Sequence, residues 1–243
     1  MRYRIDIAYD GTNYAGWQVQ PNGVTVQQRL EEALERLTGA AVKVHGSGRT
    51  DRGVHARGQV AHFDLPGAAP TSLLRGLNAL LPADIRVLRL KRVAADFHAR
   101  RQATAKEYRY FIWNDEWLPP FHRLYKAHVR RPLNVEAMRA AAARLVGRHD
   151  FQAFAANPDR AVESTVRTLW QLRVTRRGRE IVIAARADGF LYRMVRSLAG
   201  FLIRVGEGEA APEEAARILA TRRRTARVPT APPQGLFLWK VWY

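Results

Sequence analysis

The chain has 243 residues, 47% of them hydrophobic and none of them cysteine, and its 40 Lys and Arg exceed its 22 Asp and Glu by 18 charges. A chain of this length buries a core without disulfides, and it offers no thiolate nucleophile and no cysteine ligand for a metal. Its N-terminus is charged throughout and no run approaches the ~18 apolar residues that span a membrane, so we expect a cytoplasmic protein with no membrane partner.

The positive charge is unevenly distributed. Residues 1–116 hold 17 basic and 12 acidic residues, a net +5, whereas residues 117–243 hold 23 and 10, a net +13. Such an excess favours a polyanionic partner, most often nucleic acid, although a generally basic surface would give the same count. The basic residues are dispersed, which disfavours a single amphipathic helix at a membrane surface.

The first half mixes strands with helices. Residues Arg2–Tyr9 alternate between apolar and polar, which predicts a half-buried strand. Thr25 followed by Gln28 is typical of a capping box, and the apolar spacing that follows predicts a helix that ends at Gly39. The further predicted elements are strands at Val42–His45, Gln59–Asp64, Ile85–Val93 and Thr104–Trp113 and a helix at Ser72–Leu80.

A Trp- and Pro-bearing connection, Asn114–Arg123, separates the halves and predicts an N-terminal α+β domain at 1–116 and a strongly basic C-terminal α+β domain at 117–243. Short turns join the elements, which favours an α+β fold over strict βαβ alternation. The predicted elements of the second half are strands at Leu124–Val129, Thr168–Thr175, Glu180–Arg186 and Leu236–Tyr243 and helices at Val135–Val146, Tyr192–Gly206 and Pro212–Ala220.

A glycine-punctuated loop, Gly46–His55, reads GSGRTDRGVH and carries the first candidate catalytic residue, Asp51. Glycines let a backbone turn tightly near a ligand, and flanking guanidinium groups stabilise an ionised carboxylate that can act as a nucleophile or a base. The alternative is an Asp that caps the backbone of a turn. Neither G-x-x-x-x-G-K-[ST] nor G-x-G-x-x-G occurs, so the loop does not match a nucleotide-cofactor site.

A metal site is a weaker alternative. Asp51, His55, His62 and Asp64 lie within fourteen residues, but their spacing fits no known ligand pattern, and strand alternation would put them on two faces. We therefore expect no metal.

Two further segments combine basic residues with aromatic or apolar ones. Phe97–Tyr110 interleaves Arg and Tyr, as in surfaces that stack on bases and pair with phosphates, or as in a strand whose tyrosines pack in a core. In Phe190–Arg196, Arg193 and Arg196 are three residues apart and are expected to share a helix face. A buried Arg there would need a carboxylate partner such as Asp51, whereas two solvent-facing arginines would need none.

Five segments, in order along the chain, resemble the tRNA pseudouridine synthase A family. They are YDGTNYAGWQVQ, GRTDRGVH, DFHARRQATAKEYRY, MVRSLAGFLIRVGEG and PPQGLFLWKVWY. The resemblance implies two similar α+β halves, each a mostly antiparallel sheet with helices on one face, around a central basic cleft. It further implies a homodimer that isomerises uridine to pseudouridine at positions 38, 39 and 40 of the tRNA anticodon stem-loop, without cofactor or metal.

The resemblance also assigns site residues. Asp51 matches the catalytic aspartate, and Tyr108 matches a tyrosine that packs on the target base. Arg196 matches an arginine that pairs with the aspartate, and Arg49 matches one that holds the target base out of the stack. Two positions depart from the family pattern: Arg52 replaces the usual Ala and Arg193 stands where His is common. Candidate phosphate contacts for the tRNA stem are Arg176, Arg177, Arg222 and Arg223.

Two competing functions remain testable. A non-catalytic RNA-binding module would not need Asp51, and a metal-dependent nuclease would cut the RNA and stop in chelator.

Overall fold

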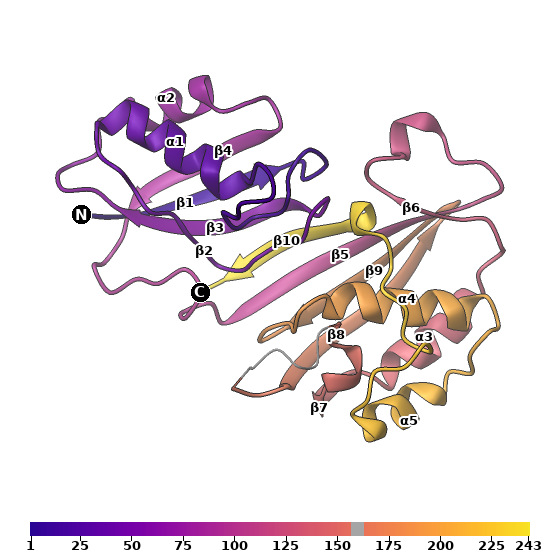
Figure 1. Cartoon of the computed structure of the whole chain (residues 1–243). Helices are drawn as coiled ribbons and strands as arrows, with labels where there is room; N and C mark the ends of the chain where they lie inside the picture. Colours follow the sequence, from indigo (N-terminus) through magenta and orange to yellow (C-terminus); the bar gives the residue numbers. More distant parts are fainter. Residues whose placement is uncertain (157–162) are drawn as a thin grey trace. The chain divides into compact units, whose positions relative to one another are not determined.

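The computed structural model describes residues 1–156 and 163–243 and divides into two compact units (Figure 1). Unit 1 comprises Met1–Thr104 with Phe237–Tyr243, and unit 2 comprises Ala105–Leu236. Both units combine helices with a mostly antiparallel sheet, which confirms the predicted α+β class.

The units do not divide the chain at the predicted boundary between residues 116 and 117, for two reasons of strand pairing. Strand β5 (Ala105–Asn114) pairs along its length with β9 (Glu180–Ala187) and so belongs with the second half. Strand β10 (Leu236–Trp242) runs parallel to β3 (His55–Asp64), which brings the C-terminal residues into unit 1.

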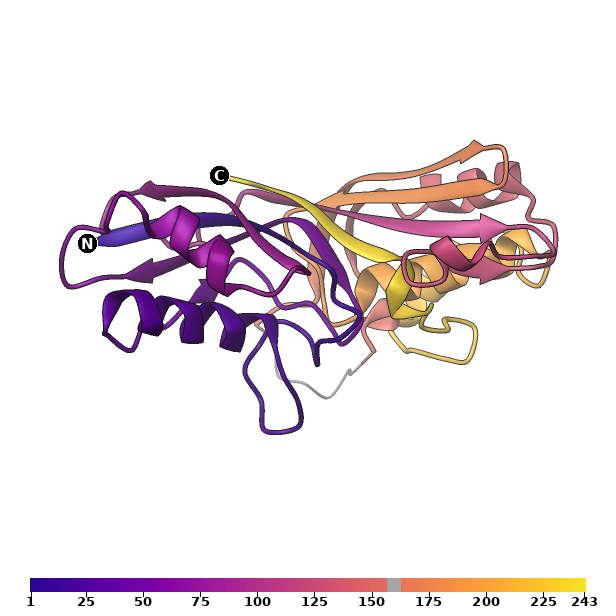
Figure 2. The same ribbon diagram turned by 90° about the horizontal axis from the view of Figure 1, so that it is seen from above.

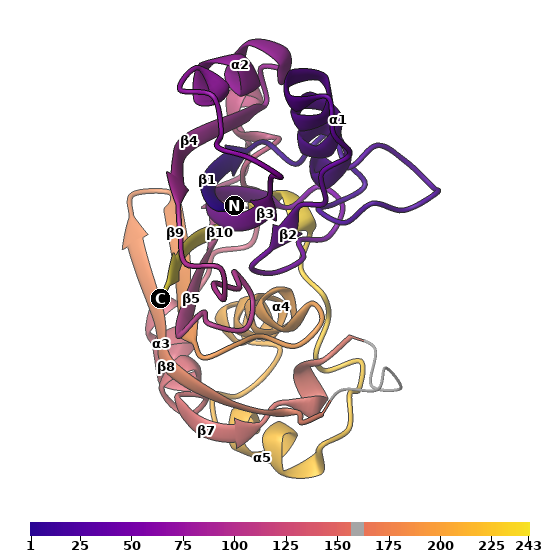
Figure 3. The same ribbon diagram turned by 90° about the vertical axis from the view of Figure 1, so that its left-hand side faces the viewer.

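The sheet of unit 1 has the order β4-β1-β3-β10, and α1 and α2 pack together on one side of it (Figure 3). Alternation in β1 puts Tyr3, Ile5, Ile7 and Tyr9 in the core, as predicted. Its remaining elements are β1 (Arg2–Tyr9), α1 (Val26–Thr38), β2 (His45–Gly46), α2 (Leu73–Leu80) and β4 (Ile85–Arg92).

The ends of α1 follow from local chemistry. The Thr25 side chain accepts a hydrogen bond from the backbone N–H of Gln28, and Gly39 ends the helix with a left-handed φ of 69°. The capping box is incomplete, because the Gln28 amide donates to Glu32 at 2.8 Å. The loop that joins β1 to α1 projects from the unit (Figure 2).

In unit 2 the order β5-β9-β8-β7 is antiparallel throughout, with β6 parallel to β5. Helices α3 and α4 pack on each other and on the sheet face that buries Tyr110 and Ile112, with α4 beside β5 (Figure 3). Its further elements are β6 (Ala127–Val129), α3 (Val135–Ala143), β7 (Gly147–Asp150), β8 (Val166–Arg177), α4 (Met194–Gly206) and α5 (Glu214–Thr221).

Some predicted elements were wrong in extent. Strand β2 is confined to His45–Gly46, although Val42 and Val44 before it are buried. The polar strand β7, sequence GRHD, was missed because it lacks alternation and exists only through its pairing with β8.

A cluster of three histidine rings lies where β2 pairs with β3. The His62 ring centroid lies 5.0 Å from that of His45 and 4.8 Å from that of His98, and its Nδ1 accepts a hydrogen bond from the Ala99 N–H. Burial, with smaller contributions from the two neighbouring rings, lowers the pKa of His62 from 6.5 to about 4. His62 is therefore neutral in the folded protein at physiological pH.

This lowered pKa predicts that unit 1 loses stability in acid. As the pH falls from 6.5 to 4, His62 binds a proton in the unfolded chain but stays neutral in the folded chain. We expect His62 to lower the free energy of unfolding by about 1–2 kcal/mol between pH 7.5 and 5. Urea titrations at the two pH values should show a smaller loss in the free energy of unfolding for His62→Asn than for wild type. The amide oxygen of the Asn can still accept from the Ala99 N–H. An equal loss in both proteins would contradict the prediction, and His149→Asn in unit 2 serves as the control.

Candidate active site

The loop that carries Asp51 is anchored where it leaves β2. The buried Ser47 hydroxyl donates to Gln59 Oε1 at 2.7 Å, and Gln59 Nε2 donates to the Gly48 carbonyl at 2.9 Å. Ser47 also donates its backbone N–H to Val60 on β3 at 2.7 Å. These bonds fix the loop to β3, an inner strand of unit 1, just before Arg49, whose side chain is exposed.

Thr50 fixes the residue immediately before Asp51. Its Oγ1 hydrogen-bonds the Tyr9 hydroxyl at 2.8 Å inside the core, and its carbonyl accepts from the Trp17 N–H at 3.0 Å. Gly16 approaches that carbonyl so closely that a Cβ there would lie 2.6 Å from it. Burial raises the pKa of Tyr9 to about 12, so its hydroxyl stays protonated as a structural partner.

Asp51 is the first residue of a tight turn. The Val54 N–H donates to the Asp51 carbonyl at 3.1 Å, and Gly53 in the third position has a φ of 73°, as in a type II turn. Arg52, in the second position, is exposed, and its Nη2 lies 3.5 Å from the Asn22 carbonyl of the projecting loop. The turn therefore presents a partly exposed carboxylate-bearing residue, with Arg52 directly after it and Arg49 two residues before it.

His55 supports the turn from within the core. It is fully buried, stacks on Phe237 with centroids 4.5 Å apart, and its Nδ1 accepts from the Gly11 N–H at 3.0 Å. The same nitrogen lies 3.1 Å from an Asp10 carboxylate oxygen. The end of β1 is thereby tied to the end of the Asp51 turn.

Tyr108 is buried on β5 in unit 2, on the face that carries the apolar residues. Its ring meets Phe190 edge-to-face, with centroids 5.1 Å apart and planes at 86°. This contact fixes the plane of the ring, as a platform for a flat ligand requires.

Arg196 lies in the first turn of α4 and is 9% exposed. Its Nε donates to the Ala231 carbonyl at 2.8 Å, and its own carbonyl accepts from the Ala231 N–H at 3.0 Å. The prediction that Arg193 and Arg196 share a helix face was wrong. Arg193 precedes the helix with a left-handed φ of 56°, is exposed, and places its guanidinium 4.8 Å from the centre of the Tyr192 ring.

The predicted residues thus fall into two pairs. Arg49 and Asp51 belong to unit 1, on one loop two residues apart, and Tyr108 and Arg196 belong to unit 2, on β5 and α4.

The candidate phosphate contacts are exposed and occupy two places in unit 2. Arg176 and Arg177 form the end of β8 at its turn to β9, about 17 Å along the strand from the level of Tyr108. Arg222 and Arg223 follow α5, where Arg222 has a φ of 51° and lies 3.4 Å from an Asp150 carboxylate oxygen.

No group of three or more His, Cys, Asp or Glu side chains within the described residues is arranged to hold a metal ion. Asp64 of the candidate set instead forms a bidentate pair with Arg2, at 2.9 and 2.7 Å. Nor does any described helix have the length and apolarity needed to cross a membrane.

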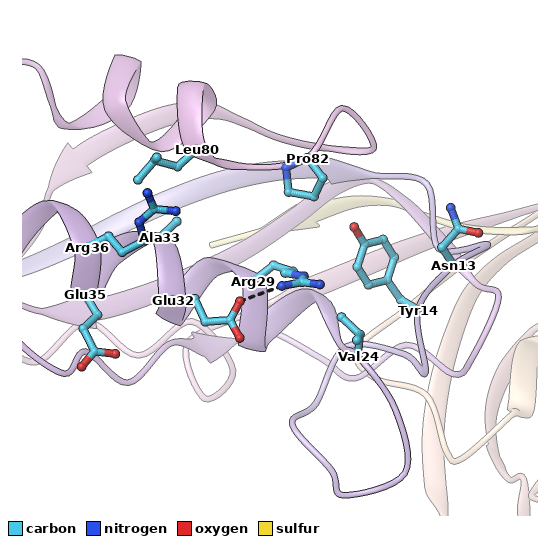
Figure 4. A pocket seen from close by; sticks show the side chains of 10 residues that line it. All are labelled: Asn13, Tyr14, Val24, Arg29, Glu32, Ala33, Glu35, Arg36, Leu80 and Pro82. Carbon is cyan, nitrogen blue, oxygen red and sulfur yellow. Dashed lines mark hydrogen bonds and ion pairs between the residues drawn. The ribbon is translucent and has the colours of Figure 1, made fainter.

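A surface hollow beside α1 is lined by Tyr14, Arg29, Arg36 and Leu80 among others (Figure 4). Its polar groups are largely engaged: Arg29 pairs with Glu32 at 3.0 Å and the Tyr14 hydroxyl donates to Asp84 at 2.5 Å. None of the predicted site residues lines it.

Sequence reasoning missed the residues that hold the site residues in place. Tyr9, Gln59 and Ala231 lie 12 to 41 positions along the chain from the residues to which they are hydrogen-bonded. Only the buried alternation of β1 gave a signal, and it indicated a core position for Tyr9 rather than a bond to Thr50.

The chain matches a family profile described as tRNA pseudouridine synthase over residues 6–100 and 141–243, which contain Arg49, Asp51 and Arg196 but not Tyr108. It is similar along its whole length to proteins named tRNA pseudouridine synthase A. The one from Brevibacillus brevis is 47% identical over 100% of this chain and 99% of its own length. The one from Halalkalibacterium halodurans is 48% identical over 97% and 90%, and the one from Rhodospirillum rubrum is 48% identical over 99% and 87%.

Among solved structures, the chain matches one in a Cbf5–Nop10–Gar1 complex at a TM-score of 0.32 and 14% identity, over 83% of this chain and 54% of that one. The sequence matches decide the family: the chain belongs to the tRNA pseudouridine synthases, isomerases that convert uridine to pseudouridine in tRNA.

Proposed function

We propose that this enzyme acts at positions 38, 39 and 40 of the tRNA anticodon stem-loop, with Asp51 as its catalytic nucleophile or base. The observation that carries the role of Asp51 is how its turn is held. Before the turn, Ser47 and Thr50 are hydrogen-bonded to Gln59 on β3 and Tyr9 on β1, and after it His55 of β3 accepts from the Gly11 N–H. A backbone held in this way can present the Asp51 side chain to a bound nucleotide without first being ordered.

The reaction breaks the N1–C1′ bond of uridine and forms a C5–C1′ bond, and the C5 proton leaves as N1 gains one. Because atoms and electrons balance within the nucleotide, the reaction needs no redox cofactor. Asp51 starts it, either by attacking the nucleotide covalently or by abstracting a proton. The target base must leave the stack before either step.

The other three residues have supporting roles in the proposal. Tyr108 offers an aromatic face to the uracil ring, and its contact with Phe190 fixes the plane of that face. Arg49 holds the target base out of the stack. Arg196, a buried cation whose Nε is fixed by Ala231, supplies the charge that stabilises the ionised form of Asp51.

We further propose that Arg176, Arg177, Arg222 and Arg223 contact phosphates of the tRNA stem, because all four are exposed on a strongly basic part of the chain. Replacing Arg176 and Arg177 together by Gln should weaken tRNA binding and reduce the slope of log Kd against log salt by about 1–2. Filter binding at several salt concentrations measures this slope. An unchanged slope would remove both residues from the interface. Arg89→Gln/Arg92→Gln, on exposed positions of β4, is the matched control.

The proposal includes a cytoplasmic homodimer. Dimerisation is tested by sedimentation equilibrium of the full chain, where a single species of 27.6 kDa would contradict it.

Position mapping tests the substrate assignment. Unmodified tRNAs carrying a single uridine at 38, 39 or 40 should each gain one pseudouridine, detected by carbodiimide labelling and primer extension. A tRNA with cytidine at all three positions should gain none. Pseudouridine elsewhere would contradict the assignment, and cleaved RNA would favour a nuclease.

A further inference from the structure

A short segment of unit 2, residues 228–232, lies against the first turns of α4 and is called the strap. Val228 and Ala231 are buried, and Ala231 donates to the Arg196 carbonyl at 3.0 Å. A Cβ at Gly200 would lie only 2.2 Å from the Pro229 carbonyl oxygen. The strap therefore touches α4 over more than one turn with no space between them.

The strap determines how Arg196 is oriented. The Ala231 carbonyl accepts from Arg196 Nε at 2.8 Å, and the next carbonyl, that of Pro232, accepts from the Tyr110 hydroxyl on β5 at 2.8 Å. A guanidinium group is planar, so a fixed Nε–H bond sets the plane in which its other nitrogens lie. A shift of the strap would rotate Arg196.

One side chain joins the strap to α4 directly. Arg224 Nη1 donates to Ser197 Oγ at 2.7 Å, and its Nη2 donates to Thr230 Oγ1 at 2.8 Å. Ser197 follows Arg196 on the helix and is fully buried, and Thr230 precedes Ala231 on the strap. Arg224 thus donates to the residue next to Arg196 and to the residue next to Ala231, the two partners of the Arg196–Ala231 hydrogen bond.

The surroundings of Arg224 differ from those of a surface phosphate contact. Throughout the described part of the chain no carboxylate pairs with it. Burial, together with the nearby charge of Arg193, lowers its pKa below the ordinary value of an arginine. Its two terminal nitrogens are already bonded to hydroxyls, whereas Arg223 beside it is exposed.

We propose that Arg224 is a positioning residue for Arg196: it clamps the strap to α4 through Thr230 and Ser197 and thereby holds the Arg196 guanidinium in place. The proposal rests on the proposed role of Arg196 in the reaction. It separates Arg224 from Arg222 and Arg223, its neighbours in the same basic run, which stay exposed.

The clamp needs two donors in a fork, and a phosphate contact needs only a charge. Arg224→Lys therefore separates the two roles. We expect Arg224→Ala and Arg224→Lys both to lower the single-turnover rate at saturating tRNA about tenfold, with the Kd for tRNA and its salt slope unchanged. Arg224→Ala/Thr230→Ala should be no slower than Arg224→Ala, because the second change removes an interaction already lost. Arg227→Ala, which loses only a surface pair with Glu214, is the control and should retain the wild-type rate.

A wild-type rate in Arg224→Lys, or a reduced salt slope in Arg224→Ala, would overturn the proposal. So would a lower melting temperature with an unchanged rate. If the Arg224 variants do not fold, Ser197→Ala and Thr230→Ala remove the partners singly and carry the same expectation. Arg196→Ala separates the proposed role of Arg196 from the clamp. A wild-type rate in Arg196→Ala contradicts the proposed role of Arg196, whereas a slow rate in Arg196→Ala with fast Arg224 variants contradicts only the clamp.

Discussion

Asp51→Asn is expected to bind tRNA as tightly as wild type and to lose turnover by about 10⁴-fold or more. Asn has the same shape but can neither attack the nucleotide as a carboxylate nor accept the proton. The Asp51 turn is closed by backbone atoms, through the Val54 N–H and the Asp51 carbonyl, so the substitution leaves the turn in place. Single-turnover assays with nuclease digestion and chromatography measure the pseudouridine formed.

Asp64→Asn is the matched control for this experiment. Asp64 is also in unit 1, its side chain is 56% exposed, and its loss removes only a surface pair with Arg2. Turnover in Asp64→Asn should be that of wild type. Turnover in Asp51→Asn within tenfold of wild type would contradict the catalytic role of Asp51.

Gly11→Ala is expected to lower the free energy of unfolding by about 2–4 kcal/mol and to slow the reaction. A Cβ at Gly11 would lie 2.0 Å from the Val54 carbonyl oxygen, which is backbone and cannot rotate away. Relief requires the end of β1 or the Asp51 turn to move, and Gly11 is also bonded to His55. Urea unfolding and single-turnover rates measured at a temperature where the variant is folded test both effects.

Gly67→Ala provides the comparison for Gly11→Ala. No atom lies within 4 Å of a Cβ at Gly67, so we expect a change within about 0.5 kcal/mol and an unchanged rate. If Gly11→Ala resembles Gly67→Ala in both measurements, the close contact between β1 and the Asp51 turn does not constrain the site.

Periodicity was sufficient to predict the elements whose burial is regular. In β1 every second side chain is buried, and α1 has both a capping residue and a terminating glycine, so local rules and tertiary packing agree. They disagree in β7, whose four residues carry no apolar pattern and become a strand only because β8 supplies the pairing.

The candidate site was only partly predictable, for a related reason. The glycines around Asp51 indicate a tight turn, and Gly53 does adopt a positive φ there. The bonds that hold this turn come from β1 and β3, and no local pattern names Tyr9 or Gln59 as partners.

At Arg193 a local pattern predicted a structure that the chain does not adopt. Helical spacing placed it on one face with Arg196, but its left-handed backbone takes it out of α4, which begins only at Met194. A non-glycine residue in that region costs free energy and is rarely anticipated from sequence.

The most direct test of the account uses unmodified tRNA with tritium at C5 of uridine, incubated with chelator and with wild type or Asp51→Asn. We predict that wild type releases tritium, leaves the RNA intact and ignores the chelator, and that Asp51→Asn releases none. Equal release by both proteins would contradict the role of Asp51. No release by wild type across several tRNAs with uridine at 38, 39 and 40 would contradict isomerisation of this substrate.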